Sequence, residues 1–242
     1  MARIGIIGAG GRMGRAIAAE MIGDAVPAGG AGRGDDVAAL AAQSDVLVDF
    51  SAPPALEANL AAAAEAGVAI VVGTTGLSHA HERLIDAAAA RIAVLQSANM
   101  SLGVNLLAHL VREAASRLGP DWDIEIVEMH HRAKVDSPSG TALLLGQAAA
   151  DGRGVDLDQV GDRGRDGIAG ARTPGHIGFA SLRGGSVAGD HQLILAGEGE
   201  RIELGHRAES RAIFARGAVR AALWLAGKPP GRYSMEDVLE LR

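Results

Sequence analysis

The first hundred residues alternate between short apolar runs and longer segments whose apolar positions recur at helical spacing. The apolar runs, which predict strands, lie at residues 3–8, 45–49, 68–72 and 92–96. The segments between them that predict helices lie at 13–22, 54–66 and 79–90. This order favours an α/β fold with a Rossmann-like, doubly wound parallel sheet.

The pattern changes beyond about residue 101. A helix to residue 117, a strand at 124–128, a second helix at about 139–151 and a polar, glycine-rich stretch at 152–175 follow one another. Three extended segments, at 176–182, 186–196 and 201–207, have glycine turns between them that favour antiparallel neighbours. We therefore expect a second α+β domain at 102–210 for substrate and oligomer contacts. A last helix at 210–226 returns the chain to the first domain, which comprises 1–101 and 211–242.

Composition excludes several classes of function. Of the 242 residues 48% are hydrophobic and only 2% aromatic, so alanine and branched aliphatic residues must fill the core. The absence of cysteine excludes thiolate catalysis, disulfides and sulfur-ligated metals. A net charge of -6 with scattered arginines argues against nucleic acid as a partner. No signal peptide or long apolar run stands out, so we expect a soluble, cytoplasmic protein with no membrane contact.

A glycine-rich turn stands between the first predicted strand and helix, where a dinucleotide fingerprint has to lie. Its spacing departs from G-x-G-x-x-G, yet glycines let the backbone approach a pyrophosphate that the helix N-terminus can receive. The alternative is a tight turn without a ligand. The expected cofactor contacts in this turn are Gly8, Ala9, Gly10, Gly11, Arg12 and Met13.

Three further loops complete the predicted cofactor site. Arg33 lies in the glycine-rich segment 29–34, where the second strand of a dinucleotide-binding fold is expected to end. No acidic residue precedes it there, which favours NADPH over NADH because arginine can bind the 2′-phosphate, although Asp35 and Asp36 argue the other way. The other two loops follow strands at the carboxyl edge of the sheet, and each could equally be an ordinary turn. Their expected contacts are Gly73, Thr74 and Thr75 in one loop, and Ser97, Ala98, Asn99 and Met100 in the other.

The segment 128–141, E-M-H-H-R-A-K-V-D-S-P-S-G-T, carries the predicted chemistry. Lys134 is one of two lysines among 23 basic residues, and a lysine can exchange a proton where an arginine cannot. His130 and His131 point to opposite sides of a strand end, so we predict that they do not bind one metal ion together. We expect one imidazole to face the reacting centre and the other to face a substrate carboxylate. The helix start at Ser139, Gly140 and Thr141 offers amides and hydroxyls to a carboxylate. An acidic small-molecule substrate follows.

These motifs resemble the 4-hydroxy-tetrahydrodipicolinate reductase family, also called dihydrodipicolinate reductases. The resemblance covers nearly the whole chain, and the segment 128–141 is its most specific part. It implies NAD(P)H-dependent reduction of a cyclic imine dicarboxylate in lysine and diaminopimelate biosynthesis, with hydride delivered from the nicotinamide. It also implies that His130 is the acid/base group, Lys134 a proton donor, and His131, Gly140 and Thr141 carboxylate ligands, in a homotetramer built through the second domain's sheet.

The chain departs from the family pattern at three places. Little sequence lies between Ile22 and Ala38, Gly32 stands where many relatives have a glutamate, and Met100 stands where an aromatic residue is expected. Two alternatives stay open. Another NAD(P)-dependent reductase of a small amino-dicarboxylate would share the nucleotide half, and a non-catalytic dinucleotide-binding sensor would not need His130 together with Lys134.

Overall fold

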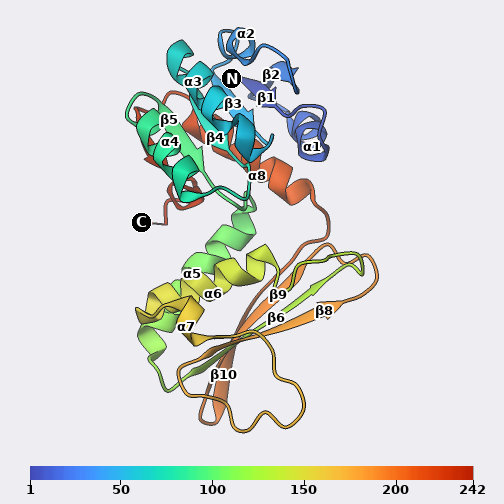
Figure 1. Cartoon of the computed structure of the whole chain (residues 1–242), viewed down its shortest axis with the longest axis vertical. Helices are drawn as coiled ribbons and strands as arrows, with labels where there is room; N and C mark the ends of the chain where they lie inside the picture. Colours follow the sequence, from blue (N-terminus) through green and yellow to red (C-terminus); the bar gives the residue numbers. More distant parts are fainter. Residues whose placement is uncertain (242) are drawn as a thin grey trace. The chain divides into compact units, whose positions relative to one another are not determined.

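The computed structural model describes residues 1–241 and divides into two compact units (Figure 1). The first comprises Met1–Leu102 and Ala212–Arg242, and the second comprises Gly103–Arg211. The chain therefore passes from one unit to the other twice. The roles that the sequence assigned to the two parts stay predictions at this level.

The first unit contains a six-stranded parallel sheet, and this confirms the predicted doubly wound α/β fold. The strand order is β11-β5-β4-β3-β1-β2. The strand order switches at β1: β2 lies on one side of it, and β3, β4 and β5 follow one another on the other side. Open α/β sheets bind ligands at the carboxyl edge beside such a switch point. The strands are β1 (Ala2–Ile7), β2 (Ala25–Ala31), β3 (Val46–Asp49), β4 (Ala69–Val72), β5 (Ala93–Gln96) and β11 (Gly231–Tyr233).

Helices cover both faces of this sheet, and the central strands β3 and β4 are therefore buried on both sides. Alternate residues of one strand enter different cores: Val46 and Val48 pack toward α1 and α8, whereas Leu47 packs toward α2, α3 and α4. The helical elements are α1 (Arg12–Glu20), α2 (Val37–Ala41), the 3-10 turn η1 (Pro53–Ala55), α3 (Leu56–Ala66), α4 (His79–Ala89), α8 (Ala212–Leu225) and α9 (Met235–Val238).

The second unit is the predicted α+β domain, with a mixed sheet ordered β10-β9-β6-β8-β7. Its strands are β6 (Asp123–His130), β7 (Gly161–Asp162), β8 (Ile177–Arg183), β9 (Asp190–Gly197) and β10 (Glu200–Arg207). Its helices are α5 (Leu102–Leu118), α6 (Gly140–Arg153) and α7 (Leu157–Val160).

One expectation about this sheet is wrong. The hairpin of β9 and β10 is antiparallel as expected, but β8 and β9 are not neighbours, since β6 lies between them. β8 pairs in parallel with β6 and with β7. A parallel pair needs a long crossover, and α6 and α7 supply it between β6 and β8. The glycine turn between β8 and β9 therefore spans the width of β6.

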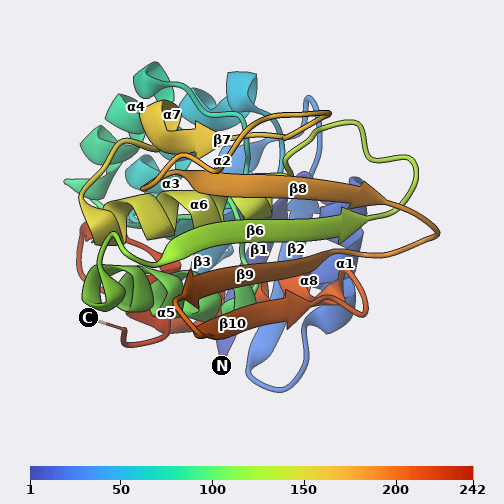
Figure 2. The same ribbon diagram turned by 90° about the horizontal axis from the view of Figure 1, so that it is seen from below.

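The two faces of this sheet differ (Figure 2). Ile124, Ile126, Leu193 and Leu195 pack on α5 and α6 and form the unit's core. The opposite face, which we call the open face, carries none of the helices described for this unit. Among the described residues, no helix is both long and apolar enough to cross a membrane.

Candidate active site

The glycine turn after β1 leaves the start of α1 open to an anion. Gly8 has φ +84°, and a Cβ there would lie 2.6 Å from the Phe50 carbonyl oxygen. The Gly11 amide donates to the Gly8 carbonyl at 2.9 Å, and Gly11 caps α1 without a side chain. The first amides of α1 thus have no side-chain acceptor and can receive a phosphate.

The glycines of this region serve two different purposes. A Cβ at Gly14 would overlap the Gly8 carbonyl, and one at Gly30 would overlap the Ala9 methyl group, so both positions allow close packing. A Cβ at Gly10 would meet nothing within 4 Å, so packing does not require glycine there. Gly10 is exposed, and its bare backbone suits the close approach of a diphosphate. The turn therefore fits a dinucleotide.

The loops after β3 and β4 are joined through the buried carboxylate of Asp49. It accepts hydrogen bonds from the Ser51 amide at 2.8 Å and from Asn59 Nδ2 at 2.9 Å, and Thr74 Oγ1 lies 3.3 Å away. The Thr74 hydroxyl is thus engaged inside the unit, whereas Thr75 is exposed. Sequence reasoning missed Asp49 and Asn59 as supports of this edge.

The loop after β5 is held by its own polar groups. Ser97 Oγ donates to the Asn99 carbonyl at 2.7 Å, and the Ser101 amide donates to Asn99 Oδ1 at 2.9 Å. Met100 is 2% exposed and belongs to the core shared with α8. A contact from Met100 to a cofactor would therefore come from its backbone, which explains how a non-aromatic residue fits there.

Arg33 lies exposed just beyond β2, and no hydrogen bond or ion pair engages its side chain within residues 1–241. The two carboxylates that follow are used locally. Asp35 Oδ2 accepts from the Gly32 amide at 2.8 Å, and Asp36 Oδ1 accepts from the Ala39 amide at 3.1 Å as the cap of α2. Arg33 is thus available to a ligand, and the aspartates stabilise the turn.

In the second unit, His130 ends β6 with its ring almost fully buried. Its Nδ1 lies 2.6 Å from Glu128 Oε2. Gly189 keeps the other ring nitrogen open, because a Cβ at position 189 would come within 2.9 Å of Nε2. His130 is therefore held from one side and accessible on the other.

Glu128 is 1% exposed and is the most heavily bonded side chain of this site. Arg183 donates two hydrogen bonds of 2.8 Å to its two oxygens, and the Ser139 amide donates to Oε1 at 3.2 Å. Burial opposes ionisation of Glu128, but the bonds from Arg183 and His130 outweigh it, and the pKa of Glu128 lies below its ordinary value. Sequence reasoning missed this role, although strand alternation puts residues 128 and 130 on one face.

His191 on β9 is a further residue that the sequence did not reveal. Its ring stands edge-on to that of His130, with 5.0 Å between centroids, and its Nε2 lies 3.1 Å from Ser139 Oγ. Burial, followed by the neighbouring His130, lowers the pKa of His191 to about 4. His191 is thus a neutral wall of the site at neutral pH.

His131 and Lys134 have partners different from those of His130. The Arg211 guanidinium donates to His131 Nε2 at 3.2 Å, and Lys134 Nζ pairs with Asp136 Oδ1 at 2.9 Å. The Lys134 side chain is 20% exposed, so its ammonium is only partly solvated. In the described part of the chain, no group of three histidine, aspartate or glutamate residues is placed to hold a metal.

The start of α6 is where the sequence predicts a carboxylate cradle, and the helix begins there. Ser139 is buried and caps the helix, its Oγ accepting from the Ala142 amide at 3.1 Å. Gly140 is exposed, and a Cβ there would meet nothing within 4 Å. Thr141 is half-buried in the first turn. The second unit thus brings His130 and Ser139, the cap of α6, together around Glu128, and Gly140 and Thr141 follow in the first turn of that helix.

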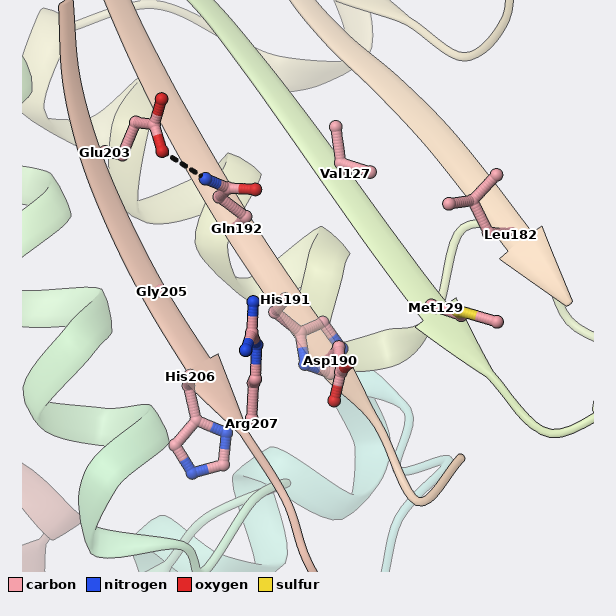
Figure 3. A pocket seen from close by; sticks show the side chains of 10 residues that line it. All are labelled: Val127, Met129, Leu182, Asp190, His191, Gln192, Glu203, Gly205, His206 and Arg207. Carbon is pink, nitrogen blue, oxygen red and sulfur yellow. Dashed lines mark hydrogen bonds between the residues drawn. The ribbon is translucent and has the colours of Figure 1, made fainter. Parts of the chain in front are cut away.

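A separate hollow of about 470 Å³ lies on the open face of the second sheet (Figure 3). Val127, Met129 and Leu182 project into it from adjacent strands, and Gln192 Nε2 donates to Glu203 Oε2 at 2.6 Å across β9 and β10. His130, Lys134 and Glu128 do not line it, but His191, whose ring stands beside that of His130, does. The hollow therefore borders the site around His130 at His191.

Two family models match the chain. The model described as dihydrodipicolinate reductase, N-terminus, matches residues 22–100, and the one described as dihydrodipicolinate reductase, C-terminus, matches residues 103–239. The glycine turn precedes the matched part.

Curated relatives cover the turn as well. The 4-hydroxy-tetrahydrodipicolinate reductase of Zymomonas mobilis is 58% identical over 99% of this chain and 97% of its own length, and that of Rhodopseudomonas palustris is 52% identical with the same coverage.

Among solved structures, a dipicolinate-bound dihydrodipicolinate reductase from a Paenisporosarcina species has a TM-score of 0.79 at 23% identity, over 98% of this chain and 99% of that one. A probable dehydrogenase from Thermotoga maritima has a TM-score of 0.61 at 15% identity, over 99% and 93%. These two structures bear on the fold alone. The matches along the full length show that this chain belongs to the dihydrodipicolinate reductase family.

Proposed function

We infer that the chain is an NAD(P)H-dependent oxidoreductase that reduces 4-hydroxy-tetrahydrodipicolinate, through dihydrodipicolinate, to tetrahydrodipicolinate in lysine and diaminopimelate biosynthesis. Full-length identity of 58% to a reductase of that name supports the reaction. The observation that carries the inference is the buried pair of Glu128 and His130 beside the start of α6. A nucleotide sensor would not need a buried, charged network around an accessible imidazole nitrogen.

The proposed roles in the second unit follow from charge and hydrogen-bonding capacity. His130 exchanges the proton at its open Nε2, and Lys134 donates a proton from its partly solvated ammonium. A carboxylate of the substrate accepts hydrogen bonds at the start of α6, where amides and the helix dipole favour an anion. The proposed substrate ligands are His131, Ser139, Gly140 and Thr141.

The proposed cofactor site belongs to the first unit. The bound nicotinamide dinucleotide supplies the hydride. Its diphosphate contacts are Gly8, Ala9, Gly10, Gly11, Arg12 and Met13, and the nicotinamide contacts are Gly73, Thr74, Thr75, Ser97, Ala98, Asn99 and Met100. The Thr74 and Met100 side chains are engaged inside the unit, so these two residues contribute through their backbone.

A coupled assay tests the reaction directly. Aspartate semialdehyde, pyruvate and the upstream synthase generate the substrate, and the loss of nicotinamide absorbance follows its reduction. We expect turnover that depends on all three additions. Oxidation of the cofactor that is equally fast with an unrelated amino-dicarboxylate would favour the alternative reductase, and binding of the cofactor without any turnover would favour the sensor.

We propose NADPH as the preferred cofactor, with Arg33 at the 2′-phosphate. The exposed guanidinium of Arg33 supports this choice, since arginine can bind a 2′-phosphate, and one oxygen each of Asp35 and Asp36 is used by backbone amides of the turn. Arg33→Ala should raise the KM for NADPH by roughly tenfold while the KM for NADH changes less than about twofold. Equal effects on both cofactors would refute the assignment. Arg91→Ala is the control variant. It also removes one arginine charge, but from a side chain that donates to the Ala64 carbonyl.

We also propose that the enzyme is a homotetramer assembled through the open face of the second sheet. The apolar side chains of Val127, Met129 and Leu182 support an interface there. Leu182 is 52% exposed in the single chain, and an interface would bury it. Contiguous apolar patches on a protein surface mark contact sites more often than they face water.

A further inference from the structure

The reaction leaves Glu128 without a chemical step of its own, although it is the most deeply buried carboxylate of the second unit's site. We propose that Glu128 is the positioning residue of the reaction: it holds His130 in one tautomer and links that ring to the carboxylate cradle at α6. This inference rests on the proposed function, in which His130 exchanges the proton.

The carboxylate dictates which nitrogen of His130 is free. An ionised carboxylate only accepts hydrogen bonds, so the 2.6 Å contact requires the hydrogen of the ring to be on Nδ1. Nε2 is then the nitrogen that accepts or releases the transferred proton. The space beside it is kept open by Gly189, where any side chain would come within 2.9 Å.

Glu128 is itself immobilised on both oxygens. Oε2 is shared by His130 Nδ1 and one Arg183 nitrogen, while Oε1 is shared by the Ser139 amide and the other Arg183 nitrogen. A bidentate arginine fixes the plane of the carboxylate as well as its place. The buried pair therefore cannot swing toward solvent, and the imidazole inherits a fixed orientation.

The same carboxylate joins two parts of the site. One oxygen reaches the imidazole, and the other reaches Ser139, whose side chain caps α6. The distance between the proton-transfer group and the carboxylate cradle is thereby set by a single rigid group. Arg183 extends the network to the loop that carries Lys134, because it also donates to the Asp136 carbonyl at 2.7 Å.

The first experiment uses Glu128→Gln, which keeps the shape and whose single oxygen can still accept from the Ser139 amide and from one Arg183 nitrogen. We expect kcat to fall by about 10- to 100-fold while the KM for the substrate changes less than about threefold. In a His130→Ala background the same substitution should lower kcat less than about twofold, since Glu128 acts through that ring. Equal losses in both backgrounds, or an unchanged kcat in the single variant, would overturn the proposal.

Glu125→Gln is the matched control. Glu125 lies on the same strand and pairs with Arg165 and Arg172, but alternation puts it on the open face. We expect wild-type kcat from this variant. Glu128→Asp keeps the charge with a shorter reach and should lose about 3- to 10-fold in kcat, less than Glu128→Gln. A Glu128→Asp variant that is worse than Glu128→Gln would contradict the role of the charge.

A spectroscopic measurement on the wild type keeps the test independent of turnover. In protein with ¹⁵N-labelled histidine rings, proton NMR should show a far-downfield ring proton on Nδ1 of His130, absent in His130→Ala. The absence of that signal in the folded wild type, or its assignment to Nε2, would overturn the proposal even if the enzyme is active. A wild type that gives the signal and does not reduce the substrate would refute the proposed reaction and leave the geometry standing.

Discussion

At the scale of single residues, Lys134 allows a sharp kinetic prediction. Its ammonium is partly buried beside Asp136, and the other lysine of the chain, Lys228, lies over the Trp224 ring at 4.2 Å. Lys134→Ala should lower kcat by roughly 10²- to 10⁴-fold, because a proton donor is lost from the transition state. Steady-state kinetics and titration of the cofactor provide the measurement, with the affinity for NADPH near the wild-type value.

Two comparisons make the Lys134 result specific. Lys134→Arg keeps the charge but cannot release a proton, so it should stay close to Lys134→Ala in kcat. Lys228→Ala removes the other lysine and should leave kcat unchanged. Full activity in Lys134→Arg would mean that the charge alone matters and that proton transfer from Lys134 is wrong.

The features that could be predicted from the sequence share one property: each depends on residues close together in the chain. The separate partners of His130 and His131 agree with strand alternation, and the start of α6 at Ser139 follows from capping preferences. Glu128, Arg183 and His191 were missed because they meet through pairing of β6, β8 and β9. Strand pairing depends on contacts between distant segments, which a linear pattern does not encode.

At the scale of elements, the turn before α1 separates glycines that pack from those that bind. Gly10→Ala should leave the melting temperature within about 1 °C of wild type, because its Cβ meets nothing within 4 Å. The same methyl group would occupy the path of the diphosphate, so the dissociation constant for NADPH should rise at least about tenfold. Calorimetric titration and thermal melts measure the two effects.

Gly14→Ala provides the contrast within the same turn. Its Cβ would overlap the Gly8 carbonyl, so it should destabilise the first unit by about 1–3 kcal/mol. A Gly10→Ala variant that binds NADPH like wild type would remove the turn from the cofactor site. A destabilised Gly10→Ala variant would mean that the turn is packed differently.

The second sheet shows where element-level prediction stops. Four parallel strands of the first unit were predicted because each is a short apolar run, and β3 and β4 are buried throughout. The edge strands β2 and β11 were not predicted as apolar runs, because they are partly exposed and rich in glycine and polar residues. β8 and β9 also read correctly as strands, but their order did not. A glycine turn between two strands permits a hairpin without requiring one, and β6 satisfies the backbone hydrogen bonds of both strands instead.

His191 on β9, which contacts Ser139 at the start of α6, predicts that the folded protein loses stability in mild acid. The pKa of His191 is lowered to about 4, so between its unfolded value of 6.5 and 4 the unfolded chain binds a proton that the folded chain does not. Stability therefore falls as pH drops through this window. Between pH 7 and pH 5 the loss from His191 should be about 2 kcal/mol, measured by urea unfolding at one protein concentration.

Substitution assigns that slope to His191. His191→Gln does not titrate and can still bond to Ser139, so its stability should change about 2 kcal/mol less between pH 7 and pH 5 than that of wild type. His79→Gln, which replaces an exposed histidine, should keep the wild-type slope. Glu128, whose pKa is lowered, adds a further loss only as pH falls below its ordinary value of 4.5. Identical slopes in His191→Gln and wild type would refute the assignment.

At the scale of the whole molecule, the proposed chemistry divides between two units that the chain enters in an interleaved order. Residues of the cofactor half come before Leu102, the substrate half lies within Gly103–Arg211, and α8 then completes the first unit's core. Deleting the segment from Ala212 onward would expose the apolar core residues that α8 covers, so the first unit needs both ends of the chain, whereas the second unit is one continuous segment.

The open face of the second sheet carries the prediction about assembly. Wild type should sediment at four times the 24.6 kDa of the single chain. Leu182→Glu places a charge among Val127 and Met129 and should shift the protein to smaller species, because an unpaired charge is costly to bury. Ile22→Glu makes the same change at a residue of the first unit that is 77% exposed, and it should stay tetrameric. If Leu182→Glu sediments like wild type, the open face is not the interface; if wild type is a monomer, the tetramer itself is refuted.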